Sequence, residues 1–167
     1  MEYDNIMHDQ LKNGIIEKVH QPWFSTEKIH YLPHPPVYKS DSLNTKLRIV
    51  TDSSAHTKDQ PSLNDCLLRG VVFAGQQEKQ IASLSLLIRF RFYGNVLIGD
   101  LEKAFLQISI RHRDRDSTRM LWPANPMLND NPEVFRFCRV AFGIKSSPFL
   151  LGATLTHHLK NHPSELA

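Results

Sequence analysis

Asp100 directly follows the apolar run Val96-Leu97-Ile98-Gly99, and an aromatic residue, Phe105, stands five positions further on. An apolar stretch of this composition predicts a buried strand. A carboxylate at the end of such a strand lies at the rim of a sheet, where it could bind a divalent cation. Asp is also a favoured N-cap, and on this stretch alone the capping of a following helical turn explains the residue equally well.

Two cations alternate with apolar residues in the run from Lys46 to Asp52. On a strand, Lys46 and Arg48 would point to the same side as Val50. Two cations on one face could bind a triphosphate, and Arg can do so with two parallel hydrogen bonds. A solvated strand face is the ordinary explanation of this pattern, and the run alone favours it.

A turn of small residues, Ala141 to Ser147, precedes a helical pattern that begins at Pro148. Gly143 would permit a close approach of the backbone to another group, and the N-terminus of the helix would favour an anion or an incoming polar group. A simple helix cap, with Ser147 as N-cap and Pro148 at the first helical position, explains the same residues. The two interpretations are compatible.

The elements that must position these residues follow from periodicity and turn chemistry. Three prolines in residues 31–39 exclude a helix and predict an extended segment at a sheet edge. We predict helices over 4–13, over 78–92 with one face formed by Ile81, Leu84, Leu87 and Ile88, and from Pro148 onward. We predict strands over 46–52, 95–99, 106–110, 119–122 and 134–140, with a turn at 100–104 and a reversal at 111–116. This order predicts an α+β fold with a mainly antiparallel sheet.

Composition sets the class of protein. The chain has 167 residues, of which 41% are hydrophobic, and a formal net charge of +3. These values suffice for a packed core and are compatible with a phosphate-bearing partner. Cys66 and Cys138 form no Cys-x-x-Cys pair, which favours a reducing compartment. Because the sequence has no signal-peptide core and no apolar run of membrane-spanning length, we expect a soluble, intracellular protein.

Six stretches, taken in their order, resemble the reverse transcriptases of retroelements, and most closely the Bel/Pao class of long-terminal-repeat retrotransposons. The resemblance covers roughly residues 5–160. The stretches that carry it are Tyr31–Val37, Lys46–Ala55, Ser62–Leu68, Asp100–Phe105, Met120–Trp122 and Phe142–Phe149.

The resemblance implies an incomplete right-hand polymerase. Residues 1–94 would form a fingers-like region, residues 95–141 part of the palm, and residues 142–167 a fingers–palm helix and a C-terminal tail. The implied activity is RNA-directed DNA polymerisation, a nucleotidyl transfer with dNTPs on an RNA or DNA primer–template.

The resemblance also implies roles for five residues around the reacting nucleotide. Asp100 matches the first catalytic aspartate, a ligand of both Mg²⁺ ions, and Leu101 would add its backbone carbonyl as a metal ligand. Phe105 matches the aromatic residue that excludes a ribonucleotide 2′-hydroxyl. Arg48 matches the arginine that binds the incoming triphosphate, with Lys46 beside it.

Four further residues match positions that face the template. Phe142 and Gly143 correspond to residues that line the nascent base pair. Ser147 and Pro148 lie in the turn that grips the template strand. These roles, like those around the nucleotide, are implied by the resemblance and not by composition or spacing.

One motif of the family is missing from the sequence. In-line phosphoryl transfer with two metal ions needs several carboxylates, and the family supplies a pair of adjacent aspartates from a second strand, in a Tyr-x-Asp-Asp hairpin. No two aspartates are adjacent in this sequence. We therefore expect a fragment that stops before the hairpin, lacks the remainder of the polymerase polyprotein and is inactive by itself.

Two alternatives remain beside the polymerase fragment. The chain could be a non-catalytic nucleic-acid-binding module that kept the fingers, or a relic without function. The expected location is the cytoplasm, with a retroelement particle or the nucleus as further options, and no membrane partner is expected.

Overall fold

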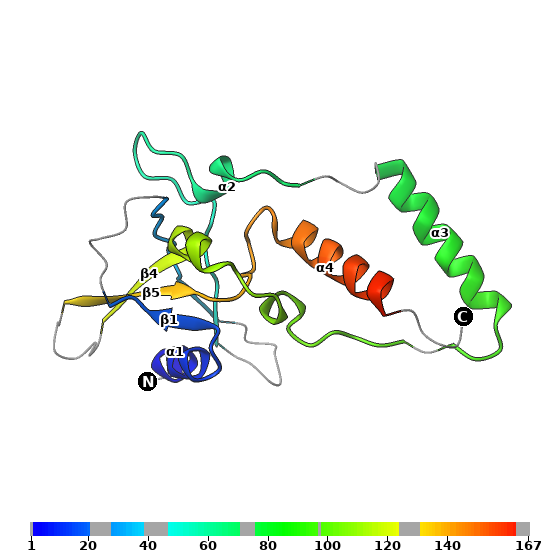
Figure 1. The fold of residues 1–167 in the computed structure, drawn as a ribbon, viewed down its shortest axis with the longest axis horizontal. Helices are drawn as coiled ribbons and strands as arrows, with labels where there is room; N and C mark the ends of the chain where they lie inside the picture. Colours follow the sequence, from blue (N-terminus) through cyan, green and yellow to red (C-terminus); the bar gives the residue numbers. More distant parts are fainter. Residues whose placement is uncertain are drawn as a thin grey trace.

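The computed structural model of the chain describes residues 2–20, 28–38, 47–70, 76–96, 98–123 and 131–162, without the side chains of residues 76–83. Short strands form two antiparallel sheets, and helices lie around and beyond them (Figure 1). This arrangement confirms the predicted α+β class with antiparallel pairing.

The larger sheet has three strands in the order β1-β5-β4. They are β1 (Ile16–Lys18), β5 (Pro132–Phe137) and β4 (Arg119–Pro123). Met120 is paired with Phe135 across the two longer strands, and both side chains are buried. The strands predicted over 119–122 and 134–140 are therefore present, although the second begins earlier and ends at Phe137.

The smaller sheet carries one of the predicted site residues. It pairs β2 (Pro36–Tyr38) with β3 (Leu47–Ile49), and Val37 lies opposite Arg48. Leu47 is buried and Arg48 is exposed, because successive side chains of a strand point to opposite faces. The core side of β3 therefore anchors the strand and leaves the guanidinium in solvent.

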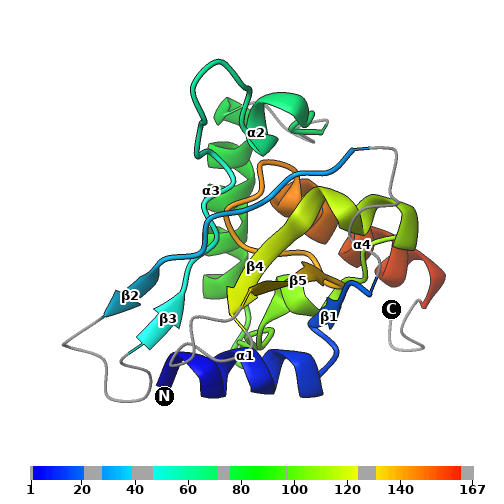
Figure 2. The same cartoon turned by 90° about the vertical axis from the view of Figure 1, so that its left-hand side faces the viewer.

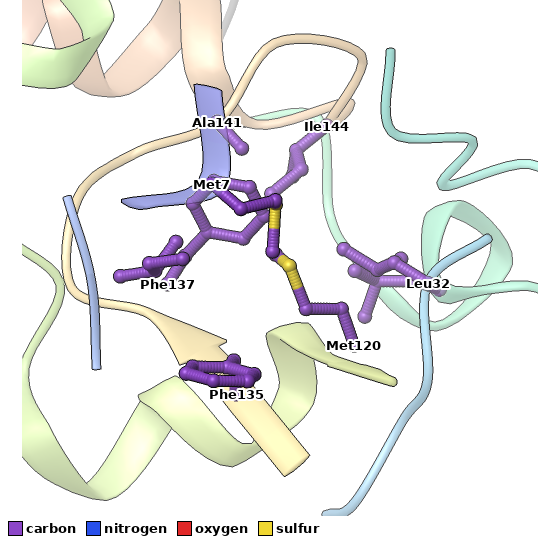
Figure 3. Packing of buried hydrophobic residues seen from close by; sticks show 9 residues of the cluster. Met7, Leu32, Met120, Phe135, Phe137, Ala141 and Ile144 are labelled. Atoms are coloured by element: carbon purple, nitrogen blue, oxygen red, sulfur yellow. The ribbon is translucent and has the colours of Figure 1, made fainter. Parts of the chain in front are cut away.

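Helix α1 (Glu2–Lys12) lies beside β1 and contributes Met7 to the core (Figures 1 and 2). In Figure 3 the side chains of Met7 and Met120 point toward the middle of the buried cluster. Ala141 and Ile144 of the turn predicted before the last helix belong to the same cluster. The core therefore joins the sheet, α1 and the turn. Its members are Met7, Ile16, Leu32, Leu63, Met120, Phe135, Phe137, Ala141 and Ile144.

Two longer helices agree with the sequence prediction in their extent. They are α3 (Gln76–Phe92) and α4 (Ser147–Asn161), and α3 stands apart from the sheets in Figure 1. Of the predicted apolar face of α3, Leu84, Leu87 and Ile88 are exposed, and the side chain of Ile81 lies outside the described part of the chain. Large apolar side chains are exposed here and in the segment that follows, namely Leu84, Leu86, Leu87, Ile88, Phe90, Phe92, Tyr93, Val96, Ile98 and Leu101.

The prediction of a strand over 95–99 is wrong for the residues that the structure describes. Residues 95, 96, 98 and 99 lie in irregular backbone, Ile98 is 86% exposed, and residue 97 falls outside the described residues. A strand needs a neighbouring strand as hydrogen-bond partner for its backbone groups. The two sheets of the described residues are formed by other segments. Asp100 consequently does not lie at the rim of a sheet.

The strand predicted over 106–110 is also largely wrong. A 3₁₀ helix occupies Ala104–Gln107 after Lys103, whose φ of 51° is left-handed. Only the end of the stretch is extended, where the amide of Ile110 donates to the carbonyl of Cys138. The reversal predicted at 111–116 is a second 3₁₀ helix, His112–Thr118.

A network of ion pairs lies along the three-stranded sheet. Asp116 Oδ1 accepts hydrogen bonds from Arg119 Nε at 2.9 Å and lies 3.0 Å from Arg136 Nη1. Arg136 Nε donates to Glu17 Oε1 at 2.7 Å, and Arg115 Nη1 donates to Glu17 Oε2 at 2.9 Å. The Arg119 side chain is 1% exposed. The two carboxylates thus connect strands β1, β4 and β5 to the 3₁₀ helix before β4.

The two carboxylates of this network have lowered pKa values. Burial acts to raise the pKa of Asp116, but hydrogen bonds from Arg119 and Arg136 outweigh it. Burial likewise acts to raise the pKa of Glu17, and hydrogen bonds from Arg136, the Cys138 thiol and Arg115 lower it further than burial raises it. Groups with lowered pKa values stabilise the fold above their ordinary values of 3.8 and 4.5, and this stability is lost as the pH falls below them.

Asp116→Asn is expected to lower the free energy of unfolding by about 3 kcal/mol, because it weakens the ion pairs of a buried guanidinium. Its stability should also fall less steeply than that of the wild type between pH 5 and pH 3, as measured by urea unfolding. Asp114→Asn in the same 3₁₀ helix is the control, since its carboxylate lies 3.9 Å from Arg113 and both side chains are exposed. That control should cost less than about 1 kcal/mol. Equal losses in the two variants would contradict the network.

Candidate functional site

The turn around Gly143 packs directly against the loop that follows β3. Gly143 has a φ of 83°, and a Cβ atom there would lie 3.0 Å from the carbonyl oxygen of Thr51. The Thr51 hydroxyl donates a hydrogen bond of 2.9 Å to the carbonyl of Phe142. The positive φ and the close contact both require glycine. The close backbone approach predicted for Gly143 is therefore made to this chain's own backbone.

Asn64 fixes the other side of the same turn. Its Nδ2 atom donates to the carbonyl of Gly143 at 3.0 Å, and its Oδ1 atom accepts from the amide of Lys145 at 2.8 Å. Thr51 and Asn64 together hold the backbone from Phe142 to Lys145. Sequence analysis missed both residues as parts of the site.

A capping box places Asn64, and its Ser-x-x-Asp pattern was the signal in the sequence that could have located this residue. Ser62 is the N-cap of α2 (Leu63–Cys66), and its hydroxyl accepts from the amide of Asp65. The Asp65 carboxylate accepts in return from the amide of Ser62 at 3.0 Å. The Ser62 hydroxyl also donates to the Asp65 carboxylate at 2.7 Å, and this bond, together with the one from the Ser62 amide, lowers the pKa of Asp65. The short helix is thereby fixed at the position that lets Asn64 reach the turn.

The start of α4 differs from the prediction. Ser146 is the N-cap, and Ser147 is the first helical residue. The Ser147 side chain is 1% exposed, and its hydroxyl donates to the carbonyl of Ala141 at 2.8 Å. Ser147 therefore stabilises the turn by a hydrogen bond within it. Pro148 lies in the first turn of the helix, one position later than the predicted first helical position.

Phe149 holds the first turn of α4 against the segment after α2. Gly70 has a φ of 85°, and a Cβ atom there would lie 2.3 Å from the Phe149 ring. The ring thus occupies the space that any side chain at position 70 would need. The helix and the turn before it are therefore fixed to residues 62–70 at two places.

Two predicted site residues are in direct contact. The rings of Phe105 and Phe142 lie edge to face, with centroids 4.9 Å apart and an interplanar angle of 85°. This is a favourable geometry for an aromatic pair. Phe142 is 57% exposed, so it retains an accessible aromatic surface beside Phe105.

The predicted cation site is described only in part. Arg48 lies on β3, three residues before Thr51, and is exposed. The amide of Asp52 donates to the carbonyl of Pro33 at 2.8 Å, which fixes the segment after β3. Lys46 lies outside the described residues. The connection through Thr51 places the strand of Arg48 and the Phe142 turn in one hydrogen-bonded unit.

The predicted metal ligands do not form a complete site. Asp100 and Leu101 are exposed and lie in irregular backbone. In the described ranges, no group of three or more His, Cys, Asp or Glu side chains could bind a metal ion. Asp100 thus offers one carboxylate, whereas two Mg²⁺ ions in a phosphoryl-transfer site need several oxygen ligands. The described residues do not fit a two-metal centre.

Gly143→Ala is expected to destabilise the fold by about 2–3 kcal/mol, because it adds a left-handed strain of about 1–2 kcal/mol and a clash with the Thr51 carbonyl. Gly14→Ala is the matched control. Gly14 also has a left-handed φ, 62°, but a Cβ atom there has no neighbour within 4 Å. Its loss should be about 1 kcal/mol. Urea unfolding measures both, and identical losses would show that the contact with Thr51 contributes nothing.

Comparison with known proteins supports the fold. No family model and no curated protein matches the chain. A solved structure of a foamy viral protease-reverse transcriptase in complex with double-stranded DNA is similar to it, with 22% sequence identity and a TM-score of 0.58. The similarity covers 96% of this chain and 23% of that chain.

The part of the chain that the structure describes contains no helix long and apolar enough to cross a membrane. The Bel/Pao class, the boundaries at residues 94 and 141, and the roles of single residues remain predictions. The chain has an α+β fold similar to part of a reverse transcriptase.

Proposed function

We propose that this chain is part of an RNA-directed DNA polymerase of a Bel/Pao-class retrotransposon, and that its Phe142–Gly143 turn and Arg48 strand receive a dNTP on a primer–template. The observation that carries the proposal is the assembly of three distant segments. Phe105 contacts Phe142, and the Thr51 hydroxyl bonds the carbonyl of Phe142 just after the Arg48 strand.

The charge and exposure of Arg48 suit a triphosphate. A guanidinium donates parallel hydrogen bonds to phosphate oxygens and keeps its charge at any physiological pH. Arg48 projects from a strand whose other face is anchored by buried Leu47. We propose that Lys46 adds a second cation.

The aromatic pair suits the sugar and the base of the nucleotide. An exposed aromatic ring offers a stacking surface that tolerates any base, and Phe142 is the exposed member of the pair. In this proposal Phe105 excludes a 2′-hydroxyl by its bulk, and the turn at Gly143 lies against the nascent base pair. Ser147 shapes the turn through its bond to Ala141, and Pro148 contacts the template strand.

No metal-dependent step is assigned to residues 1–167. Asp100 and the Leu101 carbonyl are proposed as two of the Mg²⁺ ligands of a longer polymerase chain that also carries the Tyr-x-Asp-Asp pair. Without further carboxylates, developing charge on the phosphates would remain unscreened. The proposed site therefore binds and orients nucleotide but does not catalyse its transfer. We place this function in the cytoplasm, with a retroelement particle or the nucleus as the alternatives.

A non-catalytic nucleic-acid-binding module is the second candidate. The net charge of +3 favours it, and so does the predicted metal site, in which Asp100 is the one carboxylate offered and is exposed. Both candidates predict affinity for a primer–template that falls as salt rises, because phosphate contacts release counterions. Only the polymerase-derived site predicts that a matching dNTP strengthens this binding.

Binding of a labelled primer–template by residues 1–167 is expected to tighten when the dNTP complementary to the template base is added. Arg48→Ala should make this gain in affinity about tenfold smaller, because a hydrogen bond to a charged group contributes about 1.5–3 kcal/mol. Fluorescence anisotropy at two salt concentrations measures both effects.

Arg89→Ala is the control for that experiment, because it removes the same charge from an exposed position on α3. It should leave the gain from dNTP unchanged. If both variants lose the same part of the gain from dNTP, the effect of Arg48 comes from net charge alone and not from a specific contact with the triphosphate. Wild-type binding that falls with salt but ignores dNTP would favour the non-catalytic module.

Residues 1–167 are expected to give no primer extension above background with Mg²⁺ and all four dNTPs. The physical reason is that no pair of adjacent aspartates joins Asp100 in the sequence. Gel analysis of a labelled primer measures the outcome, with a complete reverse transcriptase as the positive control. Template-directed extension that disappears in Asp100→Asn would show that the chain is an active polymerase.

A further inference from the structure

Asn64 makes several hydrogen bonds across the candidate site. Its side chain bonds the carbonyl of Gly143, the amide of Lys145 and the hydroxyl of Ser54, at 3.0, 2.8 and 2.8 Å. Its backbone amide donates to the carbonyl of Ser53 at 2.9 Å. One residue thus connects the loop after β3 to the turn before α4.

The chemistry of these partners requires a carboxamide. A backbone amide can only donate and a backbone carbonyl can only accept. The residue at position 64 must therefore accept from Lys145 and donate to Gly143 at the same time. Among side chains of this length, Asn does both. Asp lacks the donor, and Ala lacks both groups.

The hydrogen bonds of the Asn64 side chain lie beside the core. Asn64 is half-buried and is not a member of the core cluster, whereas its neighbour Leu63 and Ile144 of the turn are members. Thr51 still holds the Phe142 carbonyl if Asn64 is changed. Loss of the Asn64 side chain should therefore loosen Gly143 to Lys145 and leave the sheets intact.

We infer that Asn64 is a positioning residue for the proposed nucleotide site: it sets the Phe142–Gly143 turn at a fixed place relative to the Arg48 strand. This inference rests on the proposed function. In the proposed site a dNTP contacts both the Arg48 strand and the Phe142–Gly143 turn, so it needs the two at a fixed distance. A loosened turn should therefore weaken dNTP binding more than primer–template binding.

The test compares Asn64→Ala with Ser54→Ala, which removes one partner of Asn64 but leaves its bonds to Gly143 and Lys145. The rate of amide hydrogen exchange at Lys145 reports directly on the hydrogen bond from this amide to Asn64 Oδ1. In Asn64→Ala this amide should exchange at least about tenfold faster, which corresponds to one lost hydrogen bond of about 1.4 kcal/mol. The gain in primer–template affinity from dNTP should fall about tenfold, and the affinity without dNTP should fall by less than that. Ser54→Ala should change neither value.

Asn64→Asp is the second variant, for use if Asn64→Ala lowers the melting temperature. It keeps the side-chain volume and the acceptor for Lys145, but it loses the donor to Gly143. The gain from dNTP should fall in this variant as well, while Lys145 stays protected.

Two results would overturn the inference, and they are distinguishable. If the variants keep the full gain from dNTP, Asn64 does not position the site. If the wild type shows no gain from dNTP, the proposed nucleotide site itself fails, and the role of Asn64 fails with it.

Discussion

The backbone contact between Gly143 and Thr51 is the constraint on which the candidate site depends. A Cβ atom at position 143 would lie only 3.0 Å from the Thr51 carbonyl oxygen, and hydrogen bonds from Thr51 and Asn64 hold the carbonyls of Phe142 and Gly143. Polar backbone groups must find partners when they leave water, and here the partners are Thr51, which lies 91 residues before Phe142, and Asn64 of α2, which lies 79 residues before Gly143. The turn is therefore positioned by a distant segment, which keeps Phe142 accessible beside Phe105.

The core makes the turn part of the same body as the sheet. Ala141 and Ile144 belong to the cluster that includes Met120 and Phe135 of the paired strands. The ion pairs of Asp116 with Arg119 and Arg136 connect that sheet to the segment before it. The apolar core and the ion pairs thus both stabilise the three-stranded sheet. Helix α3, in contrast, exposes its described apolar side chains. Exposed apolar surface of this extent is typical of a surface that binds another protein segment.

Elements with strong local signals could be predicted from the sequence. The helix after Pro148 and the strand that carries Arg48 are both present, because a proline at a helix start and an alternating strand are local patterns. The prediction of a strand over 95–99 is wrong, because an apolar run does not determine which segment will pair with it. The inward hydroxyl of Ser147 and the role of Asn64 depend on contacts that are distant in sequence. The resemblance to reverse transcriptases identified the correct fold, and the structure does not test its assignment of metal ligands.

The central claim is that the Arg48 strand, Phe105 and the Phe142 turn form one nucleotide site. Photo-crosslinking of a photoreactive dNTP to residues 1–167 on a primer–template, followed by peptide mapping, tests it most directly. The account predicts adducts on the peptides that contain Arg48, Phe105 or Phe142, all of which unlabelled dNTP should suppress. Adducts elsewhere on the chain, or adducts that unlabelled dNTP does not reduce, would contradict it.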